Sequence, residues 1–242
     1  MSRLIEYLAG FFDGEGSIGL YKSNRCIQIR IGQVDKKPLK LYVKVFGGTV
    51  YFSQITKGGL PYYQYNTTDS IRCGKILRSL YPYLLVKEEK AQAALGILRL
   101  PVPTSSKTVS DGYFAGLFDA EGSVHIVKYT SISVCVTQVN QVPLLLFKQR
   151  FGGEIYHKGN GVYGWFLKSK ELQEFCSALI PYLVVKKESL ILLKKFQSID
   201  LRKYELRYDE EARQEKLALA IEINMLNNLT HLRAEVDDMF AD

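Results

Sequence analysis

The sequence predicts an α+β fold, a pseudo-symmetric tandem of two halves that each have the element order αββαββα and an antiparallel sheet. Three observations support this prediction. A motif recurs at an offset of 106 residues, apolar and polar residues alternate in the strand segments, and glycine or proline stands where helices should begin or end. A chain of 242 residues with 47% hydrophobic residues is long enough to pack a core in both halves.

The clearest part of the repeat is a nine-residue motif. Residues 9–17, AGFFDGEGS, match residues 115–123, AGLFDAEGS, at seven of nine positions. Three further blocks follow in the same order in both halves: GQVD with PL (32–39) and TQVN with PL (137–144), FGG (46–48 and 151–153), and PYLLVK (82–87) and PYLVVK (181–186). This order predicts a first half at 1–100, a proline-containing linker at 101–109, a second half at 110–200 and a C-terminal extension at 201–242.

Local patterns predict the elements of each half. In the first half, helices are expected at 2–14, 38–46, 69–80 and 87–100, and strands near 27–31, 49–54 and 62–67. Ser2 is the expected N-cap of the first helix, and Gly16 is expected to stop it. Ile27, Ile29 and Ile31 alternate with polar or small residues, which predicts a half-buried strand. The second half repeats this pattern, with Ile132, Val134 and Val136 as its inward row, a turn at 158–161 and helices near 170–180 and 186–196.

Charge is distributed unevenly along the chain. The last 42 residues hold 6 Lys or Arg and 10 Asp or Glu, so the first 200 hold 26 basic and 15 acidic residues and carry about +11. A basic body suits a polyanion such as nucleic acid, although an ordinary basic surface would have the same composition. In the acidic extension, Glu210 to Leu229 has helix-forming composition, with Leu217, Ile221 and Leu226 available for packing against the second half.

Composition also narrows the kinds of site. Cys26, Cys73, Cys135 and Cys176 stand far apart without a C-x-x-C pair, so we expect reduced thiols and no zinc cluster. The three histidines lack metal-ligand spacing, so a metal site should use oxygen ligands. The sequence contains no run of about 18 apolar residues, so it predicts no membrane span, and the N-terminus lacks a signal-peptide layout. The cellular compartment stays open.

Each motif carries small residues four positions apart, Gly10 with Gly14 and Gly116 with Ala120, which lie on one helix face. Two such faces can pack backbone to backbone, which would bring Glu15 and Glu121 side by side at the helix ends. A carboxylate there faces the negative end of the helix dipole and is repelled by its neighbour. A divalent cation would offset both penalties. Asp13 and Asp119 are better candidates for structural roles.

The paired motifs resemble the LAGLIDADG homing endonucleases of the single-chain, two-motif type, over residues 4 to 200. Residues 8–16 fit the motif closely, whereas the second copy begins with Phe114. The resemblance implies that the motif helices pack at a pseudo-dyad and that the sheets form a DNA-binding saddle. It also implies that Glu15 and Glu121 bind metal, with the backbone of Gly14 and Ala120 as further candidate ligands.

The activity implied by the resemblance is Mg²⁺-dependent cleavage of a double-stranded DNA target across the minor groove by a monomer, leaving short 3′ overhangs. Mn²⁺ or Ca²⁺ would substitute for Mg²⁺ in crystals. Gln33 and Gln138 match a glutamine of the family's pockets, and strand parity supports them because each ends an inward apolar row. Lys87 and Lys186 match its lysine, although two solvated lysines at helix starts are the alternative.

The outward strand faces should contact the DNA major groove and, because they differ between halves, predict a target that is at most a partial palindrome. Four residues after the glutamine, where relatives often have a basic residue, this chain has Lys37 in one half and Val142 in the other, so the pockets are expected to differ in activity. The residues expected to contact DNA are Lys37 together with Tyr21, Ser23, Arg25, Gln28 and Arg30 in the first half, and His125, Lys128, Ser131, Ser133 and Thr137 in the second.

Two other functions remain open for this sequence. Some proteins with this fold are maturases that bind intron RNA, and a DNA-binding regulator could keep the fold without cleaving DNA. Both acids are present, which favours a nuclease over a regulator. Their presence is equally compatible with a maturase that also cleaves.

Overall fold

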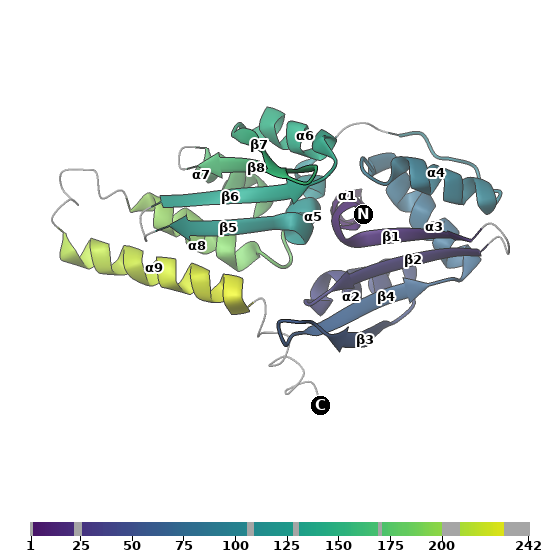
Figure 1. The fold of residues 1–242 in the computed structure, drawn as a ribbon, viewed down its shortest axis with the longest axis horizontal. Helices are drawn as coiled ribbons and strands as arrows, with labels where there is room; N and C mark the ends of the chain where they lie inside the picture. The colour runs from purple at the N-terminus through teal and green to yellow at the C-terminus, as the bar shows by residue number, and fades with distance from the viewer. Residues whose placement is uncertain are drawn as a thin grey trace. The chain divides into compact units, whose positions relative to one another are not determined.

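A computed structural model describes residues 2–21, 26–105, 109–127, 131–168, 171–199 and 209–229 (Figure 1). The described chain forms two compact units, which meet in sequence between Glu121 and Gly122. The second motif helix therefore belongs to the first unit. The division of the repeat at a 101–109 linker stays a prediction, because residues 106–108 lie outside the described part.

The first unit consists of one sheet and the helices that cover one of its faces. Its elements are α1 (Ser2–Glu15), β1 (Gly16–Tyr21), β2 (Cys26–Gln33), α2 (Lys36–Phe46), β3 (Val50–Ile55), β4 (Pro61–Thr67), α3 (Ser70–Leu80), the short 3-10 helix η1 (Tyr81–Tyr83), α4 (Glu88–Ile97) and α5 (Asp111–Glu121). The strands form an antiparallel sheet in the order β1-β2-β4-β3. The predicted row Ile27, Ile29 and Ile31 is buried beneath the helices.

The second unit repeats this topology. Its elements are β5 (Gly122–Val127), β6 (Ser131–Gln138), α6 (Gln141–Phe151), β7 (Glu154–Gly159), β8 (Val162–Lys168), α7 (Leu172–Leu179), α8 (Lys187–Ser198) and α9 (Glu210–Leu229). The sheet is antiparallel, in the order β5-β6-β8-β7. The predicted row Ile132, Val134 and Val136 is buried, and Trp165 packs 4.9 Å from the Phe147 ring at the centre of the core. The predicted α+β tandem with repeated element order is confirmed.

Several predicted helix boundaries were wrong. The helix predicted from Pro38 begins at Lys36, because the Asp35 side chain accepts a hydrogen bond from the Lys37 backbone N–H and caps it there. The helix predicted over 87–100 spans only Glu88–Ile97, and Arg99 follows with a φ of 54°. The helix predicted near 170–180 is Leu172–Leu179. Ser2 is the first residue of α1 and not its cap.

The C-terminal extension contains α9, with the predicted bounds, and α9 packs against α8 and β5 (Figure 1). The predicted packing face was wrong for Leu217 and Ile221, whereas Leu226, the third residue predicted, is half-buried. Leu219, Ala220 and Ile223 are buried, whereas Leu217 and Ile221 are 42% and 44% exposed. Helix residues 217, 219, 221 and 223 are all apolar, so periodicity did not distinguish the two faces.

Two further predictions concern the whole chain. Within the residues that the structure describes, no helix is both long and apolar enough to cross a membrane. All four cysteines are free thiols, as predicted. Burial raises the pKa of Cys73 to about 11 and that of Cys176 to about 12, so both thiols stay protonated at neutral pH.

Candidate functional site

The predicted close packing of the motif helices is confirmed within the first unit. A Cβ atom added to Gly10 would lie 2.0 Å from the Tyr113 carbonyl oxygen, and one added to Gly116 would lie 2.0 Å from the Tyr7 carbonyl oxygen. Only glycine permits two helix backbones to approach this closely. The two contacts are equivalent, so α1 and α5 are related by a local two-fold arrangement.

Two buried hydrogen bonds cross between these helices. The Tyr7 hydroxyl donates to Asp119 Oδ2 at 2.8 Å, and the Tyr113 hydroxyl donates to Asp13 Oδ2 at the same distance. Burial, reinforced by the nearby aspartate charge, raises the pKa of both tyrosines well above its ordinary value. Asp13 and Asp119 are at most 1% exposed, which supports the structural roles expected for them.

The helix pair also places both glutamates at one end of the interface. Glu15 is the last residue of α1, and Glu121 is the last residue of α5. A Cβ atom on Gly14 would lie 2.4 Å from the Ala120 Cβ and 3.5 Å from Glu121 Oε1. The Glu121 carboxylate therefore lies beside the backbone that immediately precedes Glu15. This is the arrangement expected from the small residues four apart.

Gln33 reaches this place from the sheet. It is the last residue of β2, and its side-chain nitrogen donates to Glu15 Oε1 at 3.0 Å. Its own Oε1 accepts a hydrogen bond from the Val34 backbone N–H at 2.8 Å, which fixes the orientation of the amide. Gln33 therefore ends the inward row, as strand parity predicts, and lies next to Glu15, as the family resemblance implies. Its catalytic role stays a prediction.

Lys87 lies at the C-terminal end of α1. Asp13 accepts hydrogen bonds from the backbone N–H groups of Leu85 (2.7 Å), Val86 (3.1 Å) and Lys87 (3.0 Å). Held in this way, the Lys87 ammonium donates to the carbonyl oxygens of Asp13 and Gly14. It is not a solvated lysine: burial lowers its pKa, and the charges of Asp13, Glu121 and Glu15 partly offset that effect. Glu15, Gln33 and Lys87 are called the first pocket below.

Gln138 and Lys186 lie in the second unit. Gln138 ends β6, and its Oε1 accepts a hydrogen bond from the Val139 backbone N–H at 3.2 Å. Lys186 directly precedes α8, as Lys87 precedes α4. Because Glu121 belongs to the first unit, a shared pocket with these two residues stays a prediction.

The open face of the first sheet carries a polar network. Arg30 donates to Gln28 Oε1 at 2.8 Å, the Tyr21 hydroxyl donates to the same oxygen at 3.2 Å, and Gln28 donates to Asn66 Oδ1 at 3.1 Å. The predicted residues Tyr21, Gln28 and Arg30 therefore lie together. Ser23 and Arg25 lie outside the described residues. Lys37 is exposed in the first turn of α2, and its counterpart Val142 is 47% exposed.

Sequence reasoning missed the contribution of β3 and β4 to this face. Asn66 pairs with Arg30, and Gln64 pairs with Gly32 and accepts a hydrogen bond from the Tyr51 hydroxyl at 3.1 Å. Gln64 and Asn66 alternate with buried Tyr63 and Tyr65, and this alternation was the available signal.

Tyr62 is a further residue that the sequence did not single out. A Cβ atom on Gly32 would lie 2.1 Å from the Tyr62 hydroxyl oxygen, so the phenol occupies the space left by that glycine. Burial and the negative charge of Glu15 raise the pKa of Tyr62. In the second unit the corresponding residues are Thr137 and Val162, so this phenol belongs to one half alone.

The open face of the second sheet has different chemistry. Lys158 donates to Thr137 Oγ1 at 3.3 Å, and Ser123 and His125 are hydrogen-bonded at 2.8 Å. Burial, with the nearby charge of Lys158, lowers the pKa of His125. Ser133 pairs with His125 across β5 and β6. Lys128 and the Ser131 side chain lie outside the described residues, and Lys158 and Ser123 were not predicted.

The oxygen ligands around Glu15 and Glu121 are of the kind that Mg²⁺ prefers. Among the described residues, no group of three or more His, Cys, Asp or Glu side chains could hold a metal ion. The available donors are the Glu15 and Glu121 carboxylates and nearby carbonyl oxygens, all hard oxygen ligands. Mg²⁺ is typically held by one or two carboxylates and takes its remaining ligands from water and substrate phosphates. Two acids are therefore sufficient for such a site.

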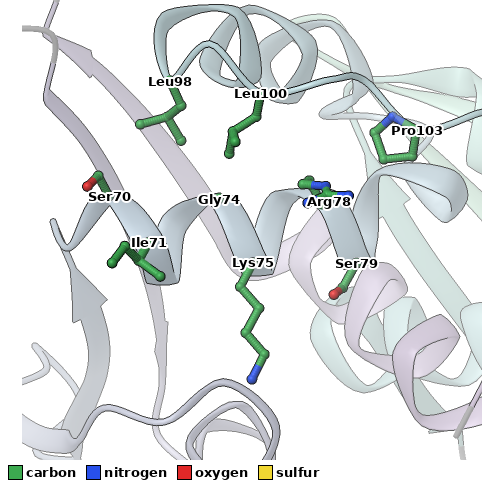
Figure 2. A pocket seen from close by; sticks show the side chains of 9 residues that line it. All are labelled: Ser70, Ile71, Gly74, Lys75, Arg78, Ser79, Leu98, Leu100 and Pro103. Atoms are coloured by element: carbon green, nitrogen blue, oxygen red, sulfur yellow. The ribbon is translucent and has the colours of Figure 1, made fainter.

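A separate open pocket of about 790 Å³ lies along α3 (Figure 2). Its lining combines apolar Ile71, Leu98 and Leu100 with Lys75 and Arg78, and it shares no residue with the first pocket.

Comparison with solved structures identifies the fold. A point mutant of I-SmaMI is 18% identical, with a TM-score of 0.66, and the match covers 91% of this chain and 99% of that one. The LAGLIDADG homing endonuclease I-GzeII, in complex with its DNA target, is 17% identical with a TM-score of 0.63, covering 89% and 96%. The LAGLIDADG homing endonuclease I-LtrWI, bound to target DNA, is 15% identical with a TM-score of 0.60, covering 90% and 96%. No protein-family model and no curated protein sequence matches the chain. The predicted LAGLIDADG fold is confirmed.

Proposed function

We propose that this chain is a LAGLIDADG homing endonuclease that makes a staggered, Mg²⁺-dependent double-strand cut in a long DNA target. The observation that carries the proposal is the close packing of α1 and α5, which brings Glu15 and Glu121 to the same end of one interface. Such an acid pair is unfavourable at helix C-termini unless a cation accompanies it. The DNA complexes of I-GzeII and I-LtrWI, which share this fold, support DNA as the substrate.

In this proposal, Glu15 and Glu121 hold Mg²⁺, with the carbonyl oxygens of Gly14 and Ala120 as further candidate ligands. The bound metal would supply Lewis-acid stabilisation of the phosphate charge and a more acidic water. Gln33 keeps the Glu15 carboxylate in one orientation through its hydrogen bond. Lys87 contributes a positive charge at the end of α1, where the phosphodiester becomes more negative during hydrolysis.

The two open sheet faces are the proposed DNA-contacting surfaces. The first carries Arg30, Gln28 and Asn66 in one network, and the second carries His125, Thr137 and Lys158. Guanidinium and amide groups are the side chains that read guanine and adenine in the major groove. Because the two faces differ, the target should be at most partly palindromic. Binding as a monomer and short 3′ overhangs follow from the resemblance.

Selection from a randomised duplex library tests the proposal. Purified protein is incubated with the library and Mg²⁺, and the cleaved molecules are sequenced to map both ends. We expect one long preferred site with short 3′ overhangs, and no products with Glu15→Gln. If no library member is cut while the host intron is spliced, the chain is a maturase; binding of a preferred duplex without cleavage would indicate a regulator.

A further inference from the structure

The buried carboxylate of Asp13 accepts hydrogen bonds from two different parts of the chain. Three come from the backbone N–H groups of residues 85–87, and the fourth comes from the Tyr113 hydroxyl on α5. Among these four donors, only Tyr113 belongs to α5, the helix that carries the second motif. The distances, between 2.7 and 3.1 Å, are those of well-formed hydrogen bonds.

Asp13 depends on these donors because it is 1% exposed. A buried carboxylate is costly unless hydrogen bonds replace its hydration. Burial raises the pKa of Asp13, while the N–H groups of Leu85 and Val86 and the Tyr113 hydroxyl lower it. Without the Tyr113 hydroxyl, Asp13 Oδ2 would keep only the two backbone donors, and the ionised form would be less stable.

Residues 85–87 in turn set the position of the first pocket. The Lys87 backbone is fixed by Asp13 Oδ1, and the Lys87 ammonium bonds to the Asp13 and Gly14 carbonyl oxygens. Those carbonyls belong to the last turn of α1, which ends in Glu15. A change at Asp13 is therefore transmitted both through the loop and through the helix end.

We propose that Tyr113 is a positioning residue for the first pocket, acting through Asp13 on Lys87 and the end of α1. The inference rests on the proposed nuclease function for its effect on cleavage. It means that a side chain of the second motif helix controls the pocket of the first motif. Tyr7 provides a matched control, because it donates an equivalent buried hydrogen bond at the same distance to Asp119.

The first test resolves the cleavage rate by strand. Each strand of the selected duplex carries its own label, and Tyr113→Phe, Tyr7→Phe and Gln33→Ala are compared with the wild type. We expect Tyr113→Phe to slow, about tenfold, the same strand that Gln33→Ala slows, as loss of a hydrogen bond to a charged group would. Tyr7→Phe should leave that strand unaffected. Equal effects of the two tyrosine variants on that strand would refute the positioning role.

The second test does not require cleavage. The protein is prepared with isotope-labelled lysine, and NMR follows the backbone amide of Lys87, whose N–H donates to Asp13 Oδ1. Without the Tyr113 hydroxyl, the Asp13 carboxylate is no longer held from α5, so Tyr113→Phe should shift this amide signal and speed its hydrogen exchange, while Tyr7→Phe leaves both unchanged. Asp13→Asn and Asp119→Asn form a second pair, which is used if Tyr113→Phe fails to fold.

These two readouts separate the inference from the proposed function. If wild type cuts no DNA but Tyr113→Phe still shifts the Lys87 amide signal, the nuclease proposal fails and the positioning contact stands. If wild type cuts DNA but neither Tyr113→Phe nor Asp13→Asn shifts that signal, the positioning role is overturned and the nuclease proposal stands.

Discussion

Replacing Gly10 by alanine tests whether α1 and α5 touch backbone to backbone. A Cβ atom on Gly10 would lie 2.0 Å from the Tyr113 carbonyl oxygen and 2.9 Å from the Leu117 amide nitrogen. Ordinary contact begins at 3.4 Å, so the shorter distance falls 1.4 Å below it. Both neighbouring atoms belong to helix backbone, so neither can rotate away and the helices must separate.

Two opposing effects decide the magnitude. Alanine in a helix interior is favoured over glycine by about 1 kcal/mol. Overpacking a well-packed interior typically costs about 1–3 kcal/mol and occasionally more. Because the overlap exceeds an ångström and involves backbone, we expect a cost at the top of that range and a net loss of about 2 kcal/mol in the free energy of unfolding.

Urea unfolding of Gly10→Ala and Gly96→Ala provides the assay and its control. Gly96 lies exposed in α4 with no atom within 4 Å of an added Cβ, so alanine there should stabilise the protein by roughly 0.5–1 kcal/mol. The same substitution should therefore have opposite signs at the two positions. A Gly10→Ala protein at least as stable as wild type would refute the backbone contact.

Three further predictions concern the site. Glu15→Gln and Glu121→Gln should each reduce double-strand cleavage by at least roughly a hundredfold while gel-shift affinity is retained, and loss of folding in both would mark them as structural. Arg30→Ala should reduce discrimination at one or two target positions by about 1–3 kcal/mol per base pair, measured by competition binding, and a uniform loss across all sequences would mean a phosphate contact. Burial lowers the Lys87 pKa below its ordinary 10.5, so between the folded and unfolded pKa values the unfolded state binds more protons. The free energy of unfolding should therefore rise with pH towards 10.5. Lys87→Met should abolish that rise, and an unchanged pH dependence of the urea midpoint would contradict the prediction.

The repeat and the small-residue spacing were sufficient to predict the packing of the two motif helices. Gly10 and Gly116 recur at matching positions, and each lies against the backbone of the other helix. Strand parity placed Gln33 at the end of a buried row, where it does reach Glu15. These predictions succeeded because each depends on a fixed backbone period.

Long-range contacts were not predictable in the same way. Asp13 binds backbone groups 72 to 74 residues later, and backbone N–H groups leave no signature in the sequence. Tyr7 and Tyr113 do recur at the offset of 106 residues, shortly before each motif, but which aspartate each hydroxyl binds depends on how the two helices pack. The open faces were predicted from two strands, whereas the register shows that β4 completes the first network through Asn66.

The proposed activity requires that Glu15 and Glu121 jointly hold a divalent cation. Mn²⁺ is the suitable probe, because it replaces Mg²⁺ and scatters anomalously, so crystals of the protein with its selected duplex can locate it directly. We expect an anomalous peak within bonding distance of both carboxylates. A Mn²⁺ peak elsewhere on the protein–DNA complex, with neither Glu15 nor Glu121 among its ligands, would contradict it.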